Sequence, residues 1–308
     1  MLFGSARRGK CTDQEDSSAL RRFDTMADKA AQQVIGVYST SFSLATMMLD
    51  REYRGHIRNL YAMVRVVDEL VDGAAAQAGE QKAEILRTLD AYESAVLAAP
   101  HQRFHTDPIL HAYGRTAREC EFSAEHVQKF FHSMRMDLQR DTHDHRSYAQ
   151  YIEGSAEVIG LLCVSVFNAG KPMSPEIEER IHTGARALGS AFQKINFLRD
   201  FAQDSQELGR VYFPSGNTHL DAESKDQIIG EIRSELQVAT QTIELLPKNA
   251  QAGVLTALGI FSELTDKLEQ FSVAEIQECR VRVSQPRKAL IAARAMRVLG
   301  PIGSAQRK

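Results

Sequence analysis

Two groups of polar side chains, each ending in a pair of aspartates, are the residues of this sequence best suited to chemistry. The first stripe consists of Tyr61, Arg65, Asp68 and Asp72, and the second stripe of Gln193, Asn196, Asp200 and Asp204. The members of each stripe are three or four residues apart, so that each stripe lies along one face of a helix.

The residues around both stripes are apolar, with Met63, Val67 and Leu70 in the first segment and Ile195 and Phe197 in the second. Carboxylates on such helices are costly to bury unless a positive charge pairs with them. Two stripes facing each other would form a site for divalent cations, and cations such as Mg²⁺ prefer oxygen ligands. A pair of salt-bridged surface helices is the alternative. The presence of two stripes, each with uncharged hydrogen-bonding residues, favours the cation site.

Tyr151 begins the segment YIEGSAEVIG, in which small residues follow at helical spacing. Gly154, Ser155 and Gly160 allow either close approach of another helix or room for a ligand. An apolar channel beside a cation site would explain both the small residues and the aspartate stripes. Gly160 is then the expected floor of that channel.

Three further segments have two interpretations each. The segment QELGRVYFP, after the second stripe, is a helix end with a glycine stop or a loop that brings Arg210 and Tyr212 to an anionic ligand. The basic residues Arg280, Arg282, Arg287 and Lys288 are ordinary surface or, since arginine suits diphosphate oxygens, part of a binding site. We interpret His143 and His145, in the charged segment DTHDHRS, as solvated rather than metal-binding.

Helical periodicity continues through most of the chain, and strand signals are weak. We expect helices over residues 27–38, 54–72, 81–98, 107–119, 124–141, 148–169, 177–204, 224–246, 250–270 and 286–298. Residues 1–24 are polar and lack periodicity, so we expect a mobile arm there and one all-α domain over residues 25–308.

Composition limits the classes of function. A net charge of −3 over 308 residues offers no basic excess for nucleic acid. The four cysteines are scattered, which indicates free thiols rather than disulfides or a zinc site. We find no run near the roughly 20 apolar residues that span a bilayer and no apolar stretch after the N-terminal basic residues. We therefore expect a cytoplasmic or loosely membrane-associated protein.

Three blocks of this sequence together resemble the squalene/phytoene synthase family, most closely its bacterial phytoene branch. They are YSTSFSLATMMLDREYRGHIRNLYAMVRVVDELVDG, YIEGSAEVIG and FQKINFLRDFAQDSQELGRVYFP. The resemblance extends from about Gly36 to Arg287. It implies an all-α fold of the isoprenoid-synthase type, with helices around a central cavity. One departure is that Tyr38 and Thr40 stand where many relatives have a basic residue or histidine.

The resemblance also implies roles for individual residues. Catalysis would involve Tyr151 near the reacting carbons and the four stripe aspartates. Mg²⁺, or Mn²⁺ in its place, would be held by Asp68, Glu69, Asp72, Asn196, Asp200 and Asp204. The substrate would contact Ser39, Ser41, Phe42, Tyr61, Arg65, Gly160, Gln193, Asn196, Arg199, Arg210 and Tyr212.

The implied reaction joins two prenyl diphosphates head to head through a cyclopropyl diphosphate. Two geranylgeranyl diphosphates would give phytoene without NADPH, and the alternative is squalene or dehydrosqualene from farnesyl diphosphate. An apolar product allows peripheral association with the inner face of a membrane and transfer to downstream carotenoid enzymes.

Rival classes fit the sequence less well. A head-to-tail prenyl elongase would have two DDxxD motifs, and neither stripe begins with paired aspartates. A di-iron bundle needs two Glu-x-x-His motifs, and we find one, from Glu179 to His182. A helical binding protein without catalysis has no need of all four stripe aspartates.

Overall fold

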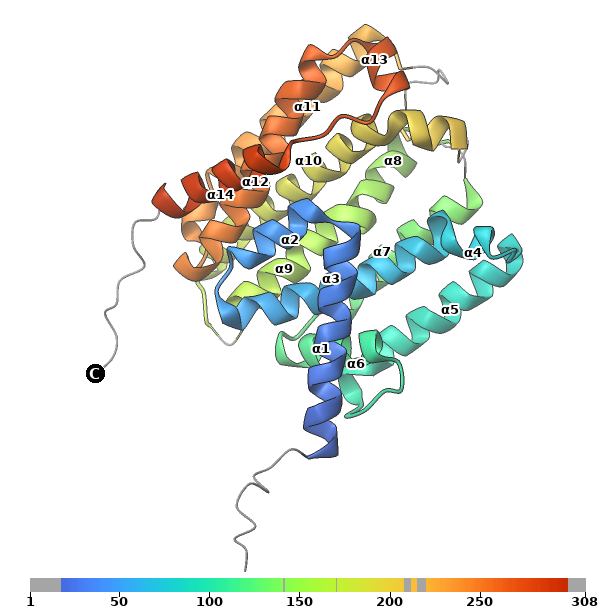
Figure 1. Ribbon diagram of the computed structural model, residues 1–308, viewed down its shortest axis with the longest axis vertical. Coiled ribbons are helices and arrows are strands. Elements are labelled where there is room, and N and C mark those ends of the chain that lie inside the picture. The colour runs from blue at the N-terminus through green and yellow to red at the C-terminus, as the bar shows by residue number, and fades with distance from the viewer. Residues whose placement is uncertain (1–17, 141, 170, 208–211, 215–219, 299–308) are drawn as a thin grey trace, which may run out of the picture.

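The computed structural model describes residues 18–140, 142–169, 171–207, 212–214 and 220–298, except for the side chains of residues 203–207. These residues form helices joined by mostly short loops, and no strand occurs among them (Figure 1). The expected all-α fold is therefore confirmed.

The helices of the N-terminal half are α1 (Ala19–Tyr38), α2 (Thr40–Met47), α3 (Arg51–Asp72), α4 (Ala74–Gln77), α5 (Lys82–Ala98), η1 (Ala99–His101), α6 (Pro108–Glu119) and α7 (Ala124–Gln139). Those of the C-terminal half are α8 (His145–Ile152), η2 (Glu153–Glu157), α9 (Val158–Asn168), α10 (Pro175–Glu207), α11 (Ala222–Thr240), η3 (Ile243–Leu245), α12 (Lys248–Gln270), α13 (Val273–Glu278) and α14 (Gln285–Val298).

The first helix begins earlier than the sequence predicts. Residues 19–24, which we assigned to a mobile arm, are the first turns of α1, and residues 1–17 lie outside the described residues. The Ser18 hydroxyl accepts a hydrogen bond from the Arg21 amide at 3.2 Å and caps the helix. Asp24 then anchors it, because its carboxylate lies 2.7 Å from Nε2 of the buried His111 in α6.

Helix α2 was not predicted separately and forms because Ser39 ends one helix and begins the next. Its amide donates to the carbonyl of Ile35, and its hydroxyl accepts from the amide of Phe42 at 3.1 Å. The chain thus turns between α1 and α2 without a long loop. This turn brings the first sequence block, with Ser39 and Phe42, alongside α3.

The long helix after α7 is interrupted by the π-helical turn η2, directly after Tyr151. At this point the buried Ser133 hydroxyl of α7 donates to the carbonyl of Tyr151 at 3.2 Å. The α7 backbone approaches closely, since a Cβ at Gly154 would lie 2.3 Å from the carbonyl oxygen of Lys129. Single π turns recur at functional sites in helices, and this one fixes where Tyr151 projects.

Two buried apolar clusters meet along this interrupted helix. Tyr151 and Ile152 belong to a cluster with α10, α11, α12 and α14. Val158 and Leu162 belong to the other cluster, with α3, α5, α6 and α7. The helix therefore connects the part of the fold that carries the first stripe with the part that carries the second.

The continuous segment His145–Asn168 is also long and apolar enough to cross a membrane, judged by length and composition alone. This corrects our expectation that no segment approaches that length. The cause is that α8, η2 and α9 join end to end. Just over half of the apolar stretch, 56%, is buried inside the protein, which is typical of a core helix.

Gly160 is not the floor of a cavity, contrary to the sequence-based expectation. A Cβ there would lie 2.4 Å from the carbonyl oxygen of Ala185 in α10. In the same way, a Cβ at Gly189 of α10 would lie 2.4 Å from the carbonyl oxygen of Ala156. The small residues therefore allow α10 to pack closely on η2 and α9, which holds the second stripe against the interrupted helix.

We expect Gly160→Ala to lower the free energy of unfolding by about 1–3 kcal/mol, because its methyl group overlaps the α10 backbone. Urea unfolding followed by circular dichroism measures the change. The control is Gly230→Ala in α11, where a Cβ meets nothing within 4 Å. This control should gain about 0.5–1 kcal/mol from helix propensity. Equal effects in both variants would contradict the close crossing.

Candidate active site

The first stripe lies on the C-terminal half of α3, where its carboxylates crowd one another. The side chain of Asp68 is only 28% exposed. Burial, followed by the charge of Asp72, raises the pKa of Asp68 to about 7. Arg65 forms an ion pair with Glu69 and lies 4.0 Å from the carboxylate of Asp68. One arginine thus offsets part of the negative charge of three acidic residues.

Tyr38 and Thr40, the departures from the family pattern, take part in contacts around the first stripe. The guanidinium of Arg65 lies 4.4 Å from the centre of the Tyr38 ring, within cation–π range. Thr40 accepts a hydrogen bond at 2.7 Å from Nζ of Lys288 in α14. The start of α2 therefore connects the first stripe with the C-terminal helix.

The second stripe lies on α10, and Asp200 is the focus of its charges. Nε of Arg199 donates to Asp200 at 2.9 Å, and Nε of Arg280 lies 2.7 Å from the same carboxylate. Gln193 and Asn196 are half-buried on the same helix. The side chain of Asp204 and all of Arg210 lie outside the described residues.

Four cations lie close enough near Asp200 to repel one another, and three of them, Arg280, Arg282 and Lys288, belong to the basic group noted in the sequence. The positive charges of Arg199 and Arg282, acting after burial, lower the pKa of both Arg280 and Lys288. Lys288 is buried, with 8% of its surface exposed. Four mutually repelling cations beside one carboxylate would bind an anion with several negative charges. The fourth basic residue of this segment, Arg287, pairs instead with Glu263 at 2.7 Å.

Tyr61, the first residue of the first stripe, also lies within the electrostatic influence of Arg199 on α10. Burial raises the pKa of Tyr61 to about 12, while the charges of Arg65 on α3 and Arg199 on α10, and a hydrogen bond with Ser39, act to lower it. Tyr61 therefore feels the charges of both stripes. Ser41 is half-buried in the first turn of α2.

Aromatic rings fill the interior next to Tyr61. Phe42 packs within 6.1 Å of the ring centres of Tyr61, Phe192 and Phe261. Phe192 and Phe261 stack at 3.9 Å. This aromatic cluster forms an apolar surface beside the charged stripes.

A buried carboxylate, Asp137 of α7, fixes the position of Tyr151. The Tyr151 hydroxyl donates to Asp137 at 2.7 Å, and the Tyr212 hydroxyl donates to its other oxygen at 3.2 Å. Burial and the charges of Asp137 and Asp72 hold the pKa of Tyr151 well above its usual range. Tyr151 is therefore a neutral phenol within the electrostatic influence of Asp72 of the first stripe.

Tyr212 and His143 are placed differently from the sequence-based expectation. Tyr212 is buried and stacks on Phe197 at 4.1 Å, so that it supports Tyr151 rather than projecting toward an anion. His143 is also buried, with its ring 5.8 Å from that of Tyr212. Our interpretation of His143 as solvated is therefore wrong. Asp144 caps α8 through its hydrogen bond from the Ser147 amide at 2.7 Å.

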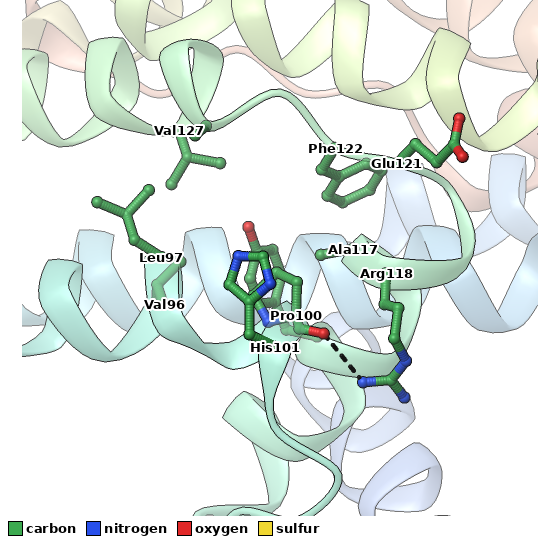
Figure 2. Close-up of a pocket in the computed structure, with 11 residues that line it drawn as sticks. Val96, Leu97, Pro100, His101, Ala117, Arg118, Glu121, Phe122 and Val127 are labelled. Carbon is green, nitrogen blue, oxygen red and sulfur yellow. Dashed lines mark hydrogen bonds between the residues drawn. The ribbon is translucent and has the colours of Figure 1, made fainter.

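An open hollow of about 250 Å³ lies elsewhere, between η1, α6 and α7 (Figure 2). Its wall is mostly apolar, with His101, Arg118 and Glu121 among the polar residues. The Arg118 guanidinium donates to the backbone carbonyl of Pro100 at 3.2 Å. The hollow is smaller than typical ligand pockets of about 300–1,000 Å³, and no stripe residue lines it.

The donor set of the stripes fits a hard divalent cation, because Asp68, Asp72 and Asp200 supply only oxygen ligands. In this structure Arg65, Arg199 and Arg280 offset their charges. No cluster of three or more acidic, histidine or cysteine side chains is close enough to hold a metal within the described part of the chain. A bound cation would therefore require Arg280 to leave Asp200 or the helices to shift.

Comparison with known proteins identifies the family. The model of the squalene/phytoene synthase family matches residues 35–287. This chain belongs to that family. Its members are head-to-head prenyltransferases, so the protein is an enzyme of isoprenoid biosynthesis.

Among relatives, chloroplastic phytoene synthase 2 of Solanum lycopersicum is 25% identical over 278 residues, which cover 84% of this chain and 86% of that protein. Chloroplastic phytoene synthase 1 of Arabidopsis thaliana is 31% identical over 186 residues, 59% of this chain and 42% of that protein. The chain thus spans most of the first relative but less than half of the second.

Solved structures share the fold. A dehydrosqualene synthase in complex with a ligand aligns with a TM-score of 0.72 and 18% identity, covering 90% of this chain and 97% of that one. A squalene synthase from Alicyclobacillus acidocaldarius aligns with a TM-score of 0.68 and 19% identity, covering 80% and 94%. These alignments confirm the isoprenoid-synthase type of fold.

We expect Asp68→Asn to stabilise the metal-free protein at about pH 8 and to stabilise it less at about pH 5. The folded-state pKa of Asp68, about 7, lies above its ordinary value of 3.8. Between these values the folded protein binds more protons than the unfolded chain, so wild-type stability falls as the pH rises. Asparagine does not ionise, so the Asp68→Asn variant avoids this loss of stability.

Thermal unfolding in the presence of a chelator measures the difference in stability between the variant and the wild type. Each kcal/mol shifts the midpoint temperature of unfolding by about 2–4 °C. A variant that is less stable than wild type at pH 8 would contradict the crowding of carboxylates on α3.

Proposed function

We propose that this enzyme is a phytoene synthase. Two geranylgeranyl diphosphates are joined head to head, with loss of one diphosphate and one proton, to give a cyclopropyl diphosphate. Loss of the second diphosphate, rearrangement and loss of another proton give phytoene, and no reductant is consumed. The observation that carries the proposal is the gathering of Arg199, Arg280, Arg282 and Lys288 beside the acidic stripes. The sequence similarity to several phytoene synthases supports the phytoene branch.

Each charged group has a task in this reaction. Asp68, Asp72, Asp200 and, with its side chain undescribed, Asp204 would hold Mg²⁺ or Mn²⁺. The metal supplies Lewis-acid stabilisation of a departing diphosphate, worth several kcal/mol in a dry site. The cations beside Asp200 bind the diphosphate oxygens, and arginine does so with two parallel hydrogen bonds.

Glu69 keeps Arg65 in place rather than binding metal in this arrangement, since the two form an ion pair. Arg65 is thereby held between the first stripe and the ring of Tyr38.

The apolar interior protects the carbocation that ionisation creates. Water would convert it to an alcohol, so the site must exclude water. The faces of Phe42, Phe192 and Phe261 line that interior and attract positive charge through their ring quadrupoles. Tyr151, held by Asp137, presents a neutral hydroxyl at the border of the first stripe.

Transfer of the product to downstream carotenoid enzymes is a prediction of this proposal, and the cytoplasmic location expected from the sequence also stays a prediction.

We expect diphosphate release to depend on Mg²⁺ and to fall at least roughly 100-fold in Asp200→Asn, because a metal ligand is lost. The assay measures diphosphate released from geranylgeranyl diphosphate with and without Mg²⁺. The matched control, Asp226→Asn, alters an exposed aspartate of α11 and should keep full activity. Near-normal turnover in folded Asp200→Asn protein would refute the metal assignment.

The product distinguishes the two branches of the family. We expect geranylgeranyl diphosphate with Mg²⁺ and no NADPH to give a C40 hydrocarbon as the main product, measured by mass spectrometry. The alternative is a C30 hydrocarbon from farnesyl diphosphate, which the similarity in fold to a dehydrosqualene synthase and a squalene synthase favours. A main C30 product, with the C20 substrate left unchanged, would show that the chain belongs to that branch.

A further inference from the structure

We propose that the open hollow between η1, α6 and α7 is a second binding site, which takes a small uncharged ring compound with one acceptor oxygen (Figure 2). None of the residues that line this hollow belongs to an aspartate stripe. The proposal therefore goes beyond the proposed function and does not depend on which product the enzyme makes.

The walls of the hollow are apolar and belong to one of the two buried clusters. Figure 2 shows Leu97 and Val127 on one side of the space and the ring of Phe122 on the other. Small-molecule sites have such apolar walls, with a few polar groups that orient the ligand. Four lining residues are at most 2% exposed and belong to the cluster with α3, α5, α6 and α7, namely Val96, Tyr113, Ala117 and Val127.

The backbone around the hollow is held in place on two sides. Glu121, between α6 and α7, has a φ of 53°, a left-handed conformation that is uncommon for residues other than glycine. The Phe122 amide then donates to the carbonyl of Ala117 at 2.9 Å, as in the Schellman motif at helix ends. On the side of η1, a Cβ at Gly114 would lie 2.8 Å from the carbonyl oxygen of Ala99. The hollow is therefore a preformed feature of the fold.

The hydroxyl of Tyr113 is the group that indicates a ligand. Tyr113 lines the hollow although only 1% of the residue is exposed, and no hydrogen bond of its hydroxyl is found among the described residues. Burial raises the pKa of Tyr113 above its ordinary value, so the side chain is a neutral phenol that can donate. A buried donor without a partner is destabilising, and an acceptor oxygen of a ligand would satisfy it.

The charged side chains at the edge of the hollow do not favour an ion. Arg118 donates to the backbone carbonyls of Pro100 at 3.2 Å and Gln102 at 3.0 Å. Glu121, of the opposite charge, lies at the same edge. Figure 2 shows the charged ends of Arg118 and Glu121 directed away from the centre of the hollow. We therefore expect an uncharged ligand.

A free small molecule fits this hollow better than a side chain of a partner protein does. The centre of a protein interface is depleted in charged residues. Here the exposed residues at the edge include His101, Arg118 and Glu121, while Leu97 and Phe122 are half-buried. The hollow thus lacks the surrounding apolar surface that a protein partner would cover.

The size of the hollow limits the class of ligand. Its volume of about 250 Å³ is below that of pockets for drug-sized ligands, about 300–1,000 Å³, and suits a single substituted ring. A cyclic terpenoid ketone combines an apolar ring with one acceptor oxygen. Carvone is such a ketone, and limonene is the matched hydrocarbon, with a methylene group in place of the carbonyl.

The test is calorimetric titration of the full-length protein, without substrate, with carvone and with limonene. We expect saturable binding of carvone. Tyr113→Phe should weaken carvone binding by about 3- to 10-fold, because one hydrogen bond is lost, and should not weaken limonene binding. The matched control is Tyr92→Phe, since the Tyr92 hydroxyl is also buried without a partner among the described residues but does not line the hollow. It should leave the binding of both compounds unchanged.

Crystals grown with carvone locate the bound molecule, because the aromatic cluster around Phe42 is also apolar. We expect electron density for carvone beside Tyr113 and Phe122. Density only elsewhere, absence of saturable carvone binding, or an equal loss in Tyr92→Phe would overturn the proposal. An equal loss of limonene binding in Tyr113→Phe would also overturn it, because the hydroxyl would then not act by donating to the ligand.

Discussion

The arrangement of the site depends on repulsion among like charges that the fold holds close together. Acidic side chains crowd on α3, and their burial and mutual repulsion leave Asp68 with a pKa near 7. Basic side chains crowd beside α10, where Arg199, Arg280, Arg282 and Lys288 repel one another. We propose that a divalent cation bound together with a diphosphate would supply both signs of charge at once.

Helix packing holds these charges in place against their repulsion. The close crossing of α10 on α9 and η2, through Gly160 and Gly189, fixes the second stripe relative to the interrupted helix. The π turn and the Asp137 carboxylate fix Tyr151 at the junction of the two apolar clusters. Backbone contacts and aromatic packing thus hold the charged side chains of the site in place.

The sequence predicted the parts of the site that lie within single helices. A spacing of three and four residues places Asp68 with Asp72 and Asn196 with Asp200 wherever the helices lie, so both stripes could be recognised without a structure. The all-α class followed from the same periodicity. The role of Tyr151 came from its sequence block, and its burial agrees with that role.

Contacts between distant segments could not be predicted in this way. Arg280 reaches Asp200 across 80 residues, and Lys288 reaches Thr40 across 248. Asp137 is an acidic residue on the amphipathic helix α7, and its neighbours in the sequence carry no signal of its buried hydrogen bonds. Gly160 was ambiguous because a helical glycine indicates a close neighbour without identifying it, and here that neighbour is the backbone of Ala185.

The central claim is that metal and diphosphate bind together between the stripes, and crystals grown with Mn²⁺ and inorganic diphosphate test it most directly. We predict anomalous peaks beside Asp68, Asp72 and Asp200, with the diphosphate on Arg199 and Arg280. Anomalous peaks only elsewhere, with Arg280 still paired to Asp200, would contradict the account.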